Sequence, residues 1–316
     1  MKKLLLKREF SIFVLLIVLC TAVAIGNPHF LGAANLQNTG RLIGLFGIFS
    51  IGSGIVIMTG GIDLAIGSVM ALVGGQLAIL LTLKHWPWPV AVLFVLCVSS
   101  LLGLIHGLLI TRLKLQPFIV TLCGLLIYRG GIRFVSNDAT VGFGDAQGFE
   151  FLQHLATDKT CGIPNPLIVM LVIAVIMWVL LHRTVWGRYL FAVGQNEPAA
   201  RYSGINTRWI TTSAYVLSGL LGGVAAILFA FYTNSISPSS YAESYELYGI
   251  AAAVVGGCSL SGGEGSIMGI VLGTALLRVL QNLVILLEIP SSLELTVMGT
   301  VILLGVIADA LLKKSK

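Results

Sequence analysis

The chain is organised as long apolar segments separated by short polar turns. A helix needs about 20 apolar residues to cross the hydrocarbon core of a bilayer, and ten candidate segments meet or approach this length. They cover residues 10–26, 41–59, 66–83, 89–111, 117–135, 165–182, 210–232, 246–257, 266–287 and 292–310. The eighth is too short to span unaided. The pattern predicts an all-α, polytopic helical bundle of about ten transmembrane segments, forming one transmembrane domain over residues 1–316.

The composition agrees with lipid as the surrounding solvent. Of the residues, 57% are hydrophobic and 10% are charged, whereas about a quarter are charged in a soluble domain. The 37 glycines include the spacings Gly103-x-x-x-Gly107 and Gly219-x-x-x-Gly223. Small residues let membrane helices approach closely, so we expect these glycines to lie at tight helix contacts.

The basic residues indicate how the chain is oriented. Cytoplasmic turns of membrane proteins carry an excess of Lys and Arg, and with the N-terminus inside, 13 of the 19 basic residues are cytoplasmic. These are Lys2, Lys3, Lys7, Arg8, Arg112, Lys114, Arg183, Arg188, Arg201, Arg208, Lys313, Lys314 and Lys316. Both termini are therefore predicted to be cytoplasmic, and residues 10–26 to be an uncleaved first helix. The net charge of +6 lies in such turns, so no nucleic-acid partner is expected.

The sequence offers no chemistry for an enzyme. It contains no Gly-Lys pair, and therefore no phosphate-binding loop of the G-x-x-x-x-G-K-[ST] type. Neither H-E-x-x-H, C-x-x-C nor G-x-S-x-G occurs, and the five histidines are scattered without metal-ligand spacing. No catalytic residue, metal site or cofactor bound by this chain is expected, so the energy for any transport must come from a partner or a gradient.

One polar loop predicts a short helix outside the membrane. Asn196 or Glu197 can cap it, Pro198 suits a first helical position, and Gly204 can end it. An isolated helix of this length is unstable in water, so something must pack against it. It is either a lever for a soluble motor subunit or a helix lying on its own bundle or on lipid headgroups. The candidate coupling residues are Asn196, Glu197, Pro198, Ala199, Ala200, Arg201, Ser203 and Gly204.

Two glycine-rich turns carry further candidates. Gly60 and Gly61 precede Asp63, a carboxylate between two membrane segments, which is interpreted as a cap of the next helix or as a proton-coupling or substrate-binding group. Gly256 and Gly257 lie in a second cluster that permits a tight reversal, with either packing or pathway lining as its role. The similarity of residues 56–68 to residues 254–266 suggests a parallel internal repeat covering about 40–135 and 210–310.

Several charged residues remain to be assigned. Arg278 lies mid-way along the ninth segment, so it should face the bundle interior and find either a structural partner or the solute path. Residues 136–164 form the longest outside loop and are expected to sit in water as an acidic cap. The candidates for docking an external partner on the outer side of the membrane are Arg129, Arg133, Asp138 and Glu243. Contact with lipid headgroups is the alternative for the two arginines.

The ordered motifs resemble the ribose-type branch of ABC importer permeases, which also includes carriers of other pentoses, hexoses and autoinducer-2. The match rests on Thr59-Gly-Gly-Ile-Asp63-Leu, Gln116-Pro-Phe-Ile-Val-Thr121-Leu, Tyr128-Arg-Gly130, Gly187-Arg with Gly194-x-Asn196-x-x-Ala-Ala-x-x-Ser-Gly204-Ile, and Val255-Gly-Gly-x-Ser-Leu-Ser-Gly-Gly263. The resemblance implies a bacterial inner-membrane permease that pairs with a second permease copy or homologue. It further implies a partner ABC ATPase subunit that holds ATP and Mg, and a periplasmic sugar-binding protein. Residues 198–203 would then be the coupling helix.

Two positions depart from the resembled family, which commonly has Ser at Ala65 and a basic residue at Glu264. Our sequence-based hypothesis is ATP-driven sugar import, in which Asn38, Gln76 and Tyr232 would suit a sugar path. A gradient-driven transporter or channel is the alternative from another class, and it would use Asp63, Glu288 or Asp309 as a titrating acid. A permease for branched-chain amino acids would share the mechanism and differ in substrate.

Overall fold

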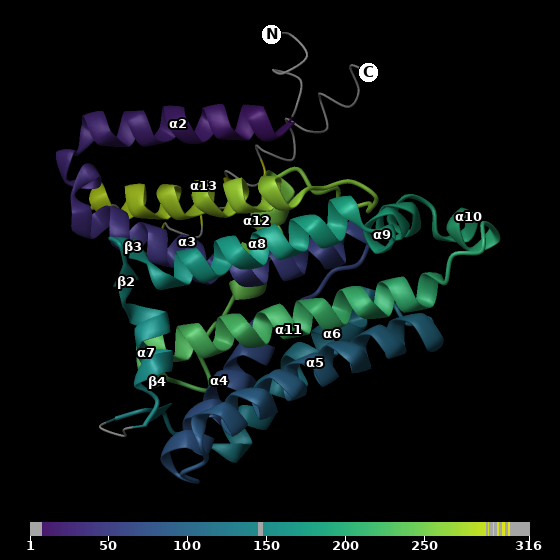
Figure 1. The fold of residues 1–316 in the computed structure, drawn as a ribbon, viewed down its shortest axis with the longest axis horizontal. Coiled ribbons are helices and arrows are strands. Elements are labelled where there is room, and N and C mark those ends of the chain that lie inside the picture. The colour runs from purple at the N-terminus through teal and green to yellow at the C-terminus, as the bar shows by residue number, and fades with distance from the viewer. Residues whose placement is uncertain are drawn as a thin grey trace.

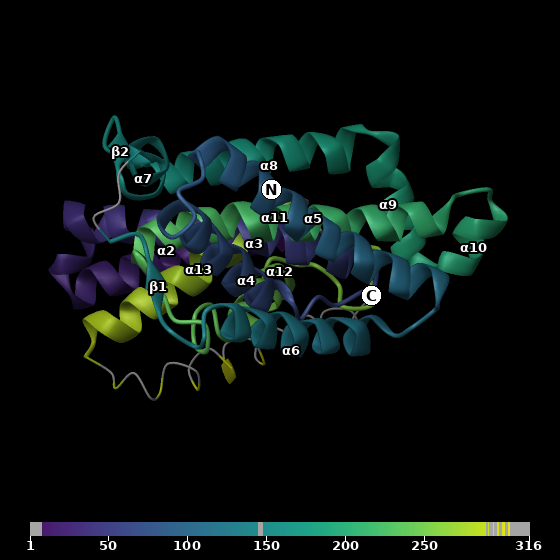
Figure 2. The ribbon, with the colours of Figure 1, turned by 90° about the horizontal axis from the view of Figure 1, so that it is seen from below.

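The structure is a computed structural model that describes residues 8–144 and 148–288, together with positions 290, 293, 296, 299, 300 and 303. Within this part the chain is an all-α bundle with four two-residue strands (Figures 1 and 2). The elements are α2 (Arg8–Gly26), η1 (Pro28–Leu31), α3 (Ala33–Met58), α4 (Ile66–Thr82), α5 (Trp88–Arg112), α6 (Pro117–Val135), β1 (Val141–Gly142), α7 (Glu150–Thr157), β2 (Lys159–Thr160), β3 (Ile163–Pro164), α8 (Asn165–Arg183), α9 (Val185–Gln195), α10 (Glu197–Tyr202), α11 (Thr207–Thr233), β4 (Ser235–Ile236), α12 (Tyr245–Val255) and α13 (Ile267–Leu286).

The predicted apolar segments coincide with helices wherever the structure describes them. Among the described residues, α2, α3, α5, α6, α8, α11 and α13 are long and apolar enough to cross a membrane, while α4 and α12 are shorter. The prediction that the eighth segment is too short is confirmed, because α12 has 11 residues. The tenth segment, 292–310, lies outside the described residues except for isolated positions. Ten spans, cytoplasmic termini and an internal repeat stay predictions.

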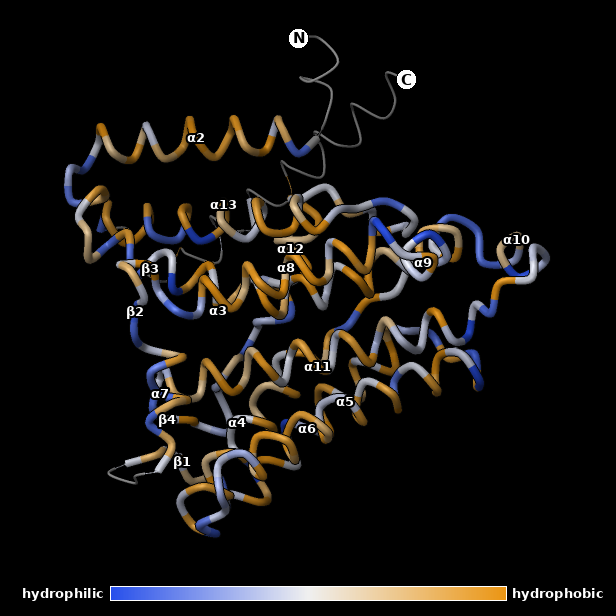
Figure 3. Tube along the Cα trace, viewed as in Figure 1, coloured by the Kyte–Doolittle hydropathy of each residue, from blue (hydrophilic) through white to orange (hydrophobic). Residues whose placement is uncertain are grey.

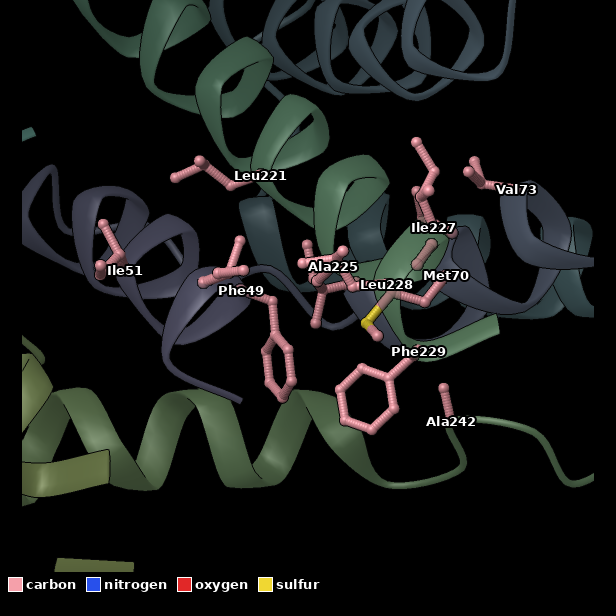
Figure 4. Packing of buried hydrophobic residues seen from close by; sticks show 14 of the residues in the cluster. Phe49, Ile51, Met70, Val73, Leu221, Ala225, Ile227, Leu228, Phe229 and Ala242 are labelled. Atoms are coloured by element: carbon pink, nitrogen blue, oxygen red, sulfur yellow. The ribbon is translucent and has the colours of Figure 1, made fainter. Parts of the chain in front are cut away.

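Helices α3 and α11 form the centre of the bundle. Their apolar windows are 83% and 78% buried, whereas that of α2 is 6% buried at the edge (Figure 1). Phe49 of α3, Met70 of α4 and Phe229 of α11 meet in the core (Figure 4). Apolar positions run along the whole length of the helices, and polar ones gather near their ends (Figure 3). Such an outer surface suits lipid, where apolar side chains need no further cover.

The predicted glycine contacts are confirmed at two helix pairs. A Cβ on Gly103 of α5 would lie 2.3 Å from the Tyr215 carbonyl oxygen of α11, and one on Gly219 would lie 2.3 Å from the Ser99 carbonyl oxygen. Between α12 and α13, a Cβ on Gly256 would lie 2.4 Å from the Gly269 carbonyl oxygen. These helices therefore touch main chain to main chain, and the contact at Gly256 supports its interpretation as a packing position.

The bundle has two distinct ends. Helix α10 lies at one end, while α7 and the small strands lie at the other (Figures 1 and 2). At that far end, β1 pairs antiparallel with β4, and β2 pairs with β3. We refer below to the α10 end and the far end.

Candidate functional site

Helix α10 forms where the sequence predicts a short helix. The Asn196 Oδ1 accepts a hydrogen bond from the Ala199 main-chain nitrogen at 2.9 Å, which caps the helix. The Glu197 Oε1 accepts hydrogen bonds from Arg201 at 2.6 Å and from the Thr207 hydroxyl at 3.0 Å, so the helix is tied to the start of α11. These local bonds hold a six-residue helix that would not persist alone in water.

One face of α10 is exposed to solvent. Ala200 is buried against the bundle, whereas Ala199 is exposed and Tyr202 is 92% exposed. Gly204 follows with a φ of +84°, the left-handed conformation expected at the end of the helix. Tyr202 is not among the predicted coupling residues, although exposed tyrosines are enriched among residues that dominate protein interfaces. An aromatic residue in a short exposed helix was the signal that could have identified it.

Three separate motifs meet next to α10: the end of α3 with Met58 and Gly60, α9 with Gly194, and the turn before α13 with Gly262 and Gly263. We name this contact the inner junction. A Cβ on Gly194 would lie 2.0 Å from the Met58 carbonyl oxygen and 2.4 Å from the Gly263 nitrogen. The Gly263 nitrogen donates a hydrogen bond to the Met58 carbonyl oxygen at 2.9 Å. Gly60 and Gly262 adopt φ values of +81° and +85°. A displacement of α9 would therefore reach both turns through main-chain contacts.

Asp63 lies beside the inner junction and is 5% exposed. Its Oδ1 accepts a hydrogen bond from the Ala65 nitrogen at 3.0 Å, and its Oδ2 accepts one from the Ser218 hydroxyl of α11 at 2.9 Å. The expectation that Asp63 caps the next helix is wrong: α4 begins after Ala65, and no side chain caps it. The carboxylate instead joins the turn to α11, because the chain between α3 and α4 passes through the interior.

A cavity of about 620 Å³ opens next to α10. Its walls include Gly60 and Gly61, and Tyr215 of α11 also lines it. The charged residues that line it are Lys114, Glu197, Arg201 and Arg208. Three of these four are basic, so the α10 end presents a positive rim around the cavity.

A second pocket lies at the far end, and we name it the aromatic pocket. Its volume is about 230 Å³, and it is formed by α3, α11, α12 and α13. The lining residues are Asn38, Thr39, Leu42, Phe46, Phe229, Tyr232, Thr233, Tyr245, Tyr248, Arg278, Gln281, Asn282 and Ile285. Asn38 and Tyr232, which were predicted to suit a sugar path, thus share one pocket with Arg278, which was assigned either to a structural partner or to the path.

Gln76 is not part of that pocket. It lies on α4, and its Oε1 is buried without a hydrogen-bond partner among the described residues. Tyr232 and Asn38 face each other across the pocket rim, with 3.5 Å between the hydroxyl and the Oδ1. Arg278 is 4% exposed, and its guanidinium lies 3.5 Å from the centre of the Phe46 ring.

The predicted docking residues separate into two groups. Arg129 is turned inward, where its guanidinium donates to the carbonyl oxygens of Pro238 and Tyr241 and so holds the connection between α11 and α12. Arg133 and Asp138 form an exposed ion pair at 2.6 Å, and Glu243 is also exposed. Arg133 and its hydrogen bond lower the pKa of the Asp138 carboxyl below its usual value. These three stay candidates for docking at the far end.

Of the acids considered for a gradient-driven transporter, Asp63 is bound to Ser218, Glu288 is exposed after α13, and Asp309 lies outside the described residues. A bundle of apolar helices with an exposed short helix at one end and a polar, aromatic pocket at the other fits a membrane transport subunit. The chain matches the family model described as branched-chain amino acid transport system / permease component over residues 35–306, and it belongs to this family of permeases. It is thus a multi-pass permease of the bacterial inner membrane, and not an enzyme.

Curated relatives cover almost the whole chain. It is 39% identical to the ribose import permease protein of Bacillus subtilis (strain 168) over 94% of this chain and 91% of the relative. It is 36% identical to the ribose import permease protein of Haemophilus influenzae over 96% and 94%, respectively. The D-allose transport system permease protein of Escherichia coli (strain K12) is 31% identical over 96% and 92%. No solved structure matches the chain.

Proposed function

We propose that this chain is the permease subunit of an ATP-binding-cassette importer that carries ribose or a similar monosaccharide into the cytoplasm. The observation that carries the proposal is the similarity to ribose import permeases along nearly the full length. The chain has no phosphate-binding loop of its own. ATP and Mg would therefore be held by a separate ATPase subunit.

The coupling surface for that ATPase is residues 196–204. A short helix with a bare face and an exposed Tyr202 offers an anchor for a groove in a soluble partner. Closure of the ATPase would move α10, and the main-chain contacts of Gly194 would pass the displacement to the turns after α3 and before α13. The α10 end would accordingly face the cytoplasm.

Two further partners complete the proposed assembly. A periplasmic sugar-binding protein would deliver solute at the far end, where Arg133, Asp138 and Glu243 are exposed. A second permease copy or a homologue would pack beside this chain, so that the solute path lies between two permeases. Selection of the solute would begin at the binding protein.

Reconstituted transport tests the proposal directly. The chain is placed in liposomes with its ATPase and its binding protein, and uptake of labelled ribose, allose and leucine is measured with ATP inside. We expect monosaccharide uptake that stops when the ATPase is inactivated. Uptake that continues with an inactive ATPase would indicate a gradient-driven transporter, and uptake of leucine alone would indicate an amino-acid permease.

Site-specific cross-linking tests the coupling surface separately. In a variant without the native cysteines, Ala199→Cys should be trapped by the ATPase, because Ala199 is exposed on α10. Two controls should not react: Ala200→Cys, which is buried, and Phe134→Cys, which is 85% exposed at the far end. Equal trapping at all three positions, or at none, would contradict the assignment.

A further inference from the structure

We propose that the aromatic pocket binds one neutral monosaccharide within the permease, so that this subunit contributes to solute selection. The inference rests on the proposed function and names the place where the solute is recognised. The sequence predicts polar path residues singly, whereas the structure joins four helices around one cavity of about 230 Å³.

The base of the pocket is built from aromatic rings. The Phe46 ring centroid lies 4.8 Å from that of Tyr245, 5.1 Å from that of Phe229 and 5.7 Å from that of Tyr248. Rings at these separations form tilted and edge-to-face pairs that hold one another in place. A monosaccharide has an apolar face of C–H groups, and a rigid wall of rings can cover that face without a change in its own packing.

Arg278 supplies hydrogen-bond donors beside this wall. Its guanidinium lies 3.5 Å from the Phe46 ring centroid and 4.8 Å from that of Tyr248, and it donates to the Gln281 side chain. Stacking on rings stabilises a cation that would otherwise be costly to bury. Because a guanidinium has five N–H donors in a fixed plane, it can donate to several acceptors at once, and a sugar hydroxyl can be one of them.

Thr39 offers a hydroxyl that no other residue in the described part of the chain binds. It is 6% exposed, it lines the pocket, and its Oγ1 has no hydrogen-bond partner among the described residues. A buried polar atom without a partner is unfavourable, so such groups require a reason. A solute hydroxyl bound at this wall would supply the missing partner.

The charge of the lining distinguishes among solutes. Among the described residues that line the pocket, Arg278 is the one cation and none is acidic. The ammonium group of an amino acid would find no carboxylate there, and a cationic solute would be repelled. A neutral polyol needs no carboxylate partner and is not repelled by Arg278. Its hydroxyls can both donate and accept hydrogen bonds, and the side-chain amides of Asn38, Gln281 and Asn282 can do the same.

The size and depth of the pocket fit a single sugar ring. A cavity of about 230 Å³ has room for a single sugar ring, since a cavity of about 150 Å³ already accommodates benzene. Asn38, Thr233 and Ile285 at the rim are exposed, whereas Phe46, Phe229 and Arg278 are buried. The pocket is therefore entered at the far end, away from the proposed motor.

Thr39→Val tests the site without disturbing a bond within the protein. It removes the unpartnered hydroxyl, so it should not lower the thermal stability of the chain. If the hydroxyl binds solute, the rate of ATP-driven ribose uptake at low solute concentration should fall about three- to tenfold, as expected for one lost hydrogen bond. The matched control is Thr82→Val on α4, whose hydroxyl donates to the Ala78 carbonyl oxygen and lies outside the pocket. That control should transport like the wild type.

A binding measurement tests the same substitution independently of transport. Ribose should raise the unfolding temperature of the purified wild-type permease and of Thr82→Val, and should raise that of Thr39→Val less at the same concentration. A wild type that transports ribose while Thr39→Val shows unchanged uptake and an unchanged ribose-induced shift would overturn this inference and leave the proposed function standing. A wild type that transports no monosaccharide would refute the proposed function itself. Stabilisation by a sugar acid but not by ribose would overturn the assignment to neutral sugars.

Discussion

A methyl group added at Gly194 should separate α9 from the two turns that it touches. The Cβ would lie 2.0 Å from the Met58 carbonyl oxygen and 2.4 Å from the Gly263 nitrogen. Both are main-chain atoms, so neither can rotate away as a side chain would. The same two atoms share a hydrogen bond of 2.9 Å, which must lengthen if the Gly194→Ala variant is to fit.

The magnitude follows from three contributions. Overpacking a close contact costs about 1–3 kcal/mol, and weakening a main-chain hydrogen bond adds about 0.5–1.5 kcal/mol. Alanine is a better helix former than glycine, which offsets about 1 kcal/mol. We therefore expect Gly194→Ala to lower the free energy of unfolding by about 2 kcal/mol.

The assay is denaturant-induced unfolding of the purified chain in detergent micelles, with Gly131→Ala as the matched control. Gly131 lies within α6, and a Cβ there would meet nothing within 4 Å. The control should be as stable as the wild type or slightly more stable. In the assembled transporter, Gly194→Ala should also reduce the solute carried per ATP hydrolysed. If the two alanine variants were equally stable, the close packing at the inner junction would be refuted.

Three further predictions concern the neighbouring contacts. Asn196→Ala should destabilise α10 by about 1 kcal/mol through the lost cap, seen as faster amide hydrogen exchange confined to residues 197–203; protection unchanged there would contradict the cap. A double-mutant cycle of Asp63→Asn and Ser218→Ala should give a coupling energy of about 0.5–3 kcal/mol in unfolding, and strict additivity would show that their 2.9 Å bond contributes nothing. The hydrogen bond from His154 lowers the pKa of Asp158, outside the membrane segments, below its ordinary 3.8. Above pH 3.8 this bond therefore stabilises α7 fully, and the stabilisation is lost as the pH falls through the lowered pKa of Asp158. Protection of the α7 amides from hydrogen exchange should drop in that acidic range. In Asp158→Asn the lower protection should be present already at neutral pH.

Much of the local structure could be predicted because local rules fix it. A backbone in lipid must satisfy its own hydrogen bonds, so each apolar segment that the structure describes forms a helix. Helix α10 likewise depends on neighbours in sequence, with Asn196 at its start and Gly204 at its end. The buried position of Arg278 was also predictable, since a charge in mid-helix must face the protein.

The direction in which each helix faces was not predictable from the pattern. Lipid and bundle interior are both apolar, so the periodicity that orients a helix in water is weak here. Gln76 and Tyr232 were predicted for the same path, and of the two only Tyr232 lines the aromatic pocket. Arg129 was placed at an outer surface, whereas it binds carbonyl oxygens within the fold.

The sequence by itself determined that this chain is a membrane protein. It also determined which segments are helical and where a short capped helix lies outside the bundle. Only the tertiary structure decided that Asp63 binds Ser218, that Gly194 touches Met58 and Gly263, and that four helices enclose the aromatic pocket. The physical reason is the range of the forces. Apolar length and caps act within one segment, whereas these contacts join residues far apart in the chain and exist only once the helices have packed.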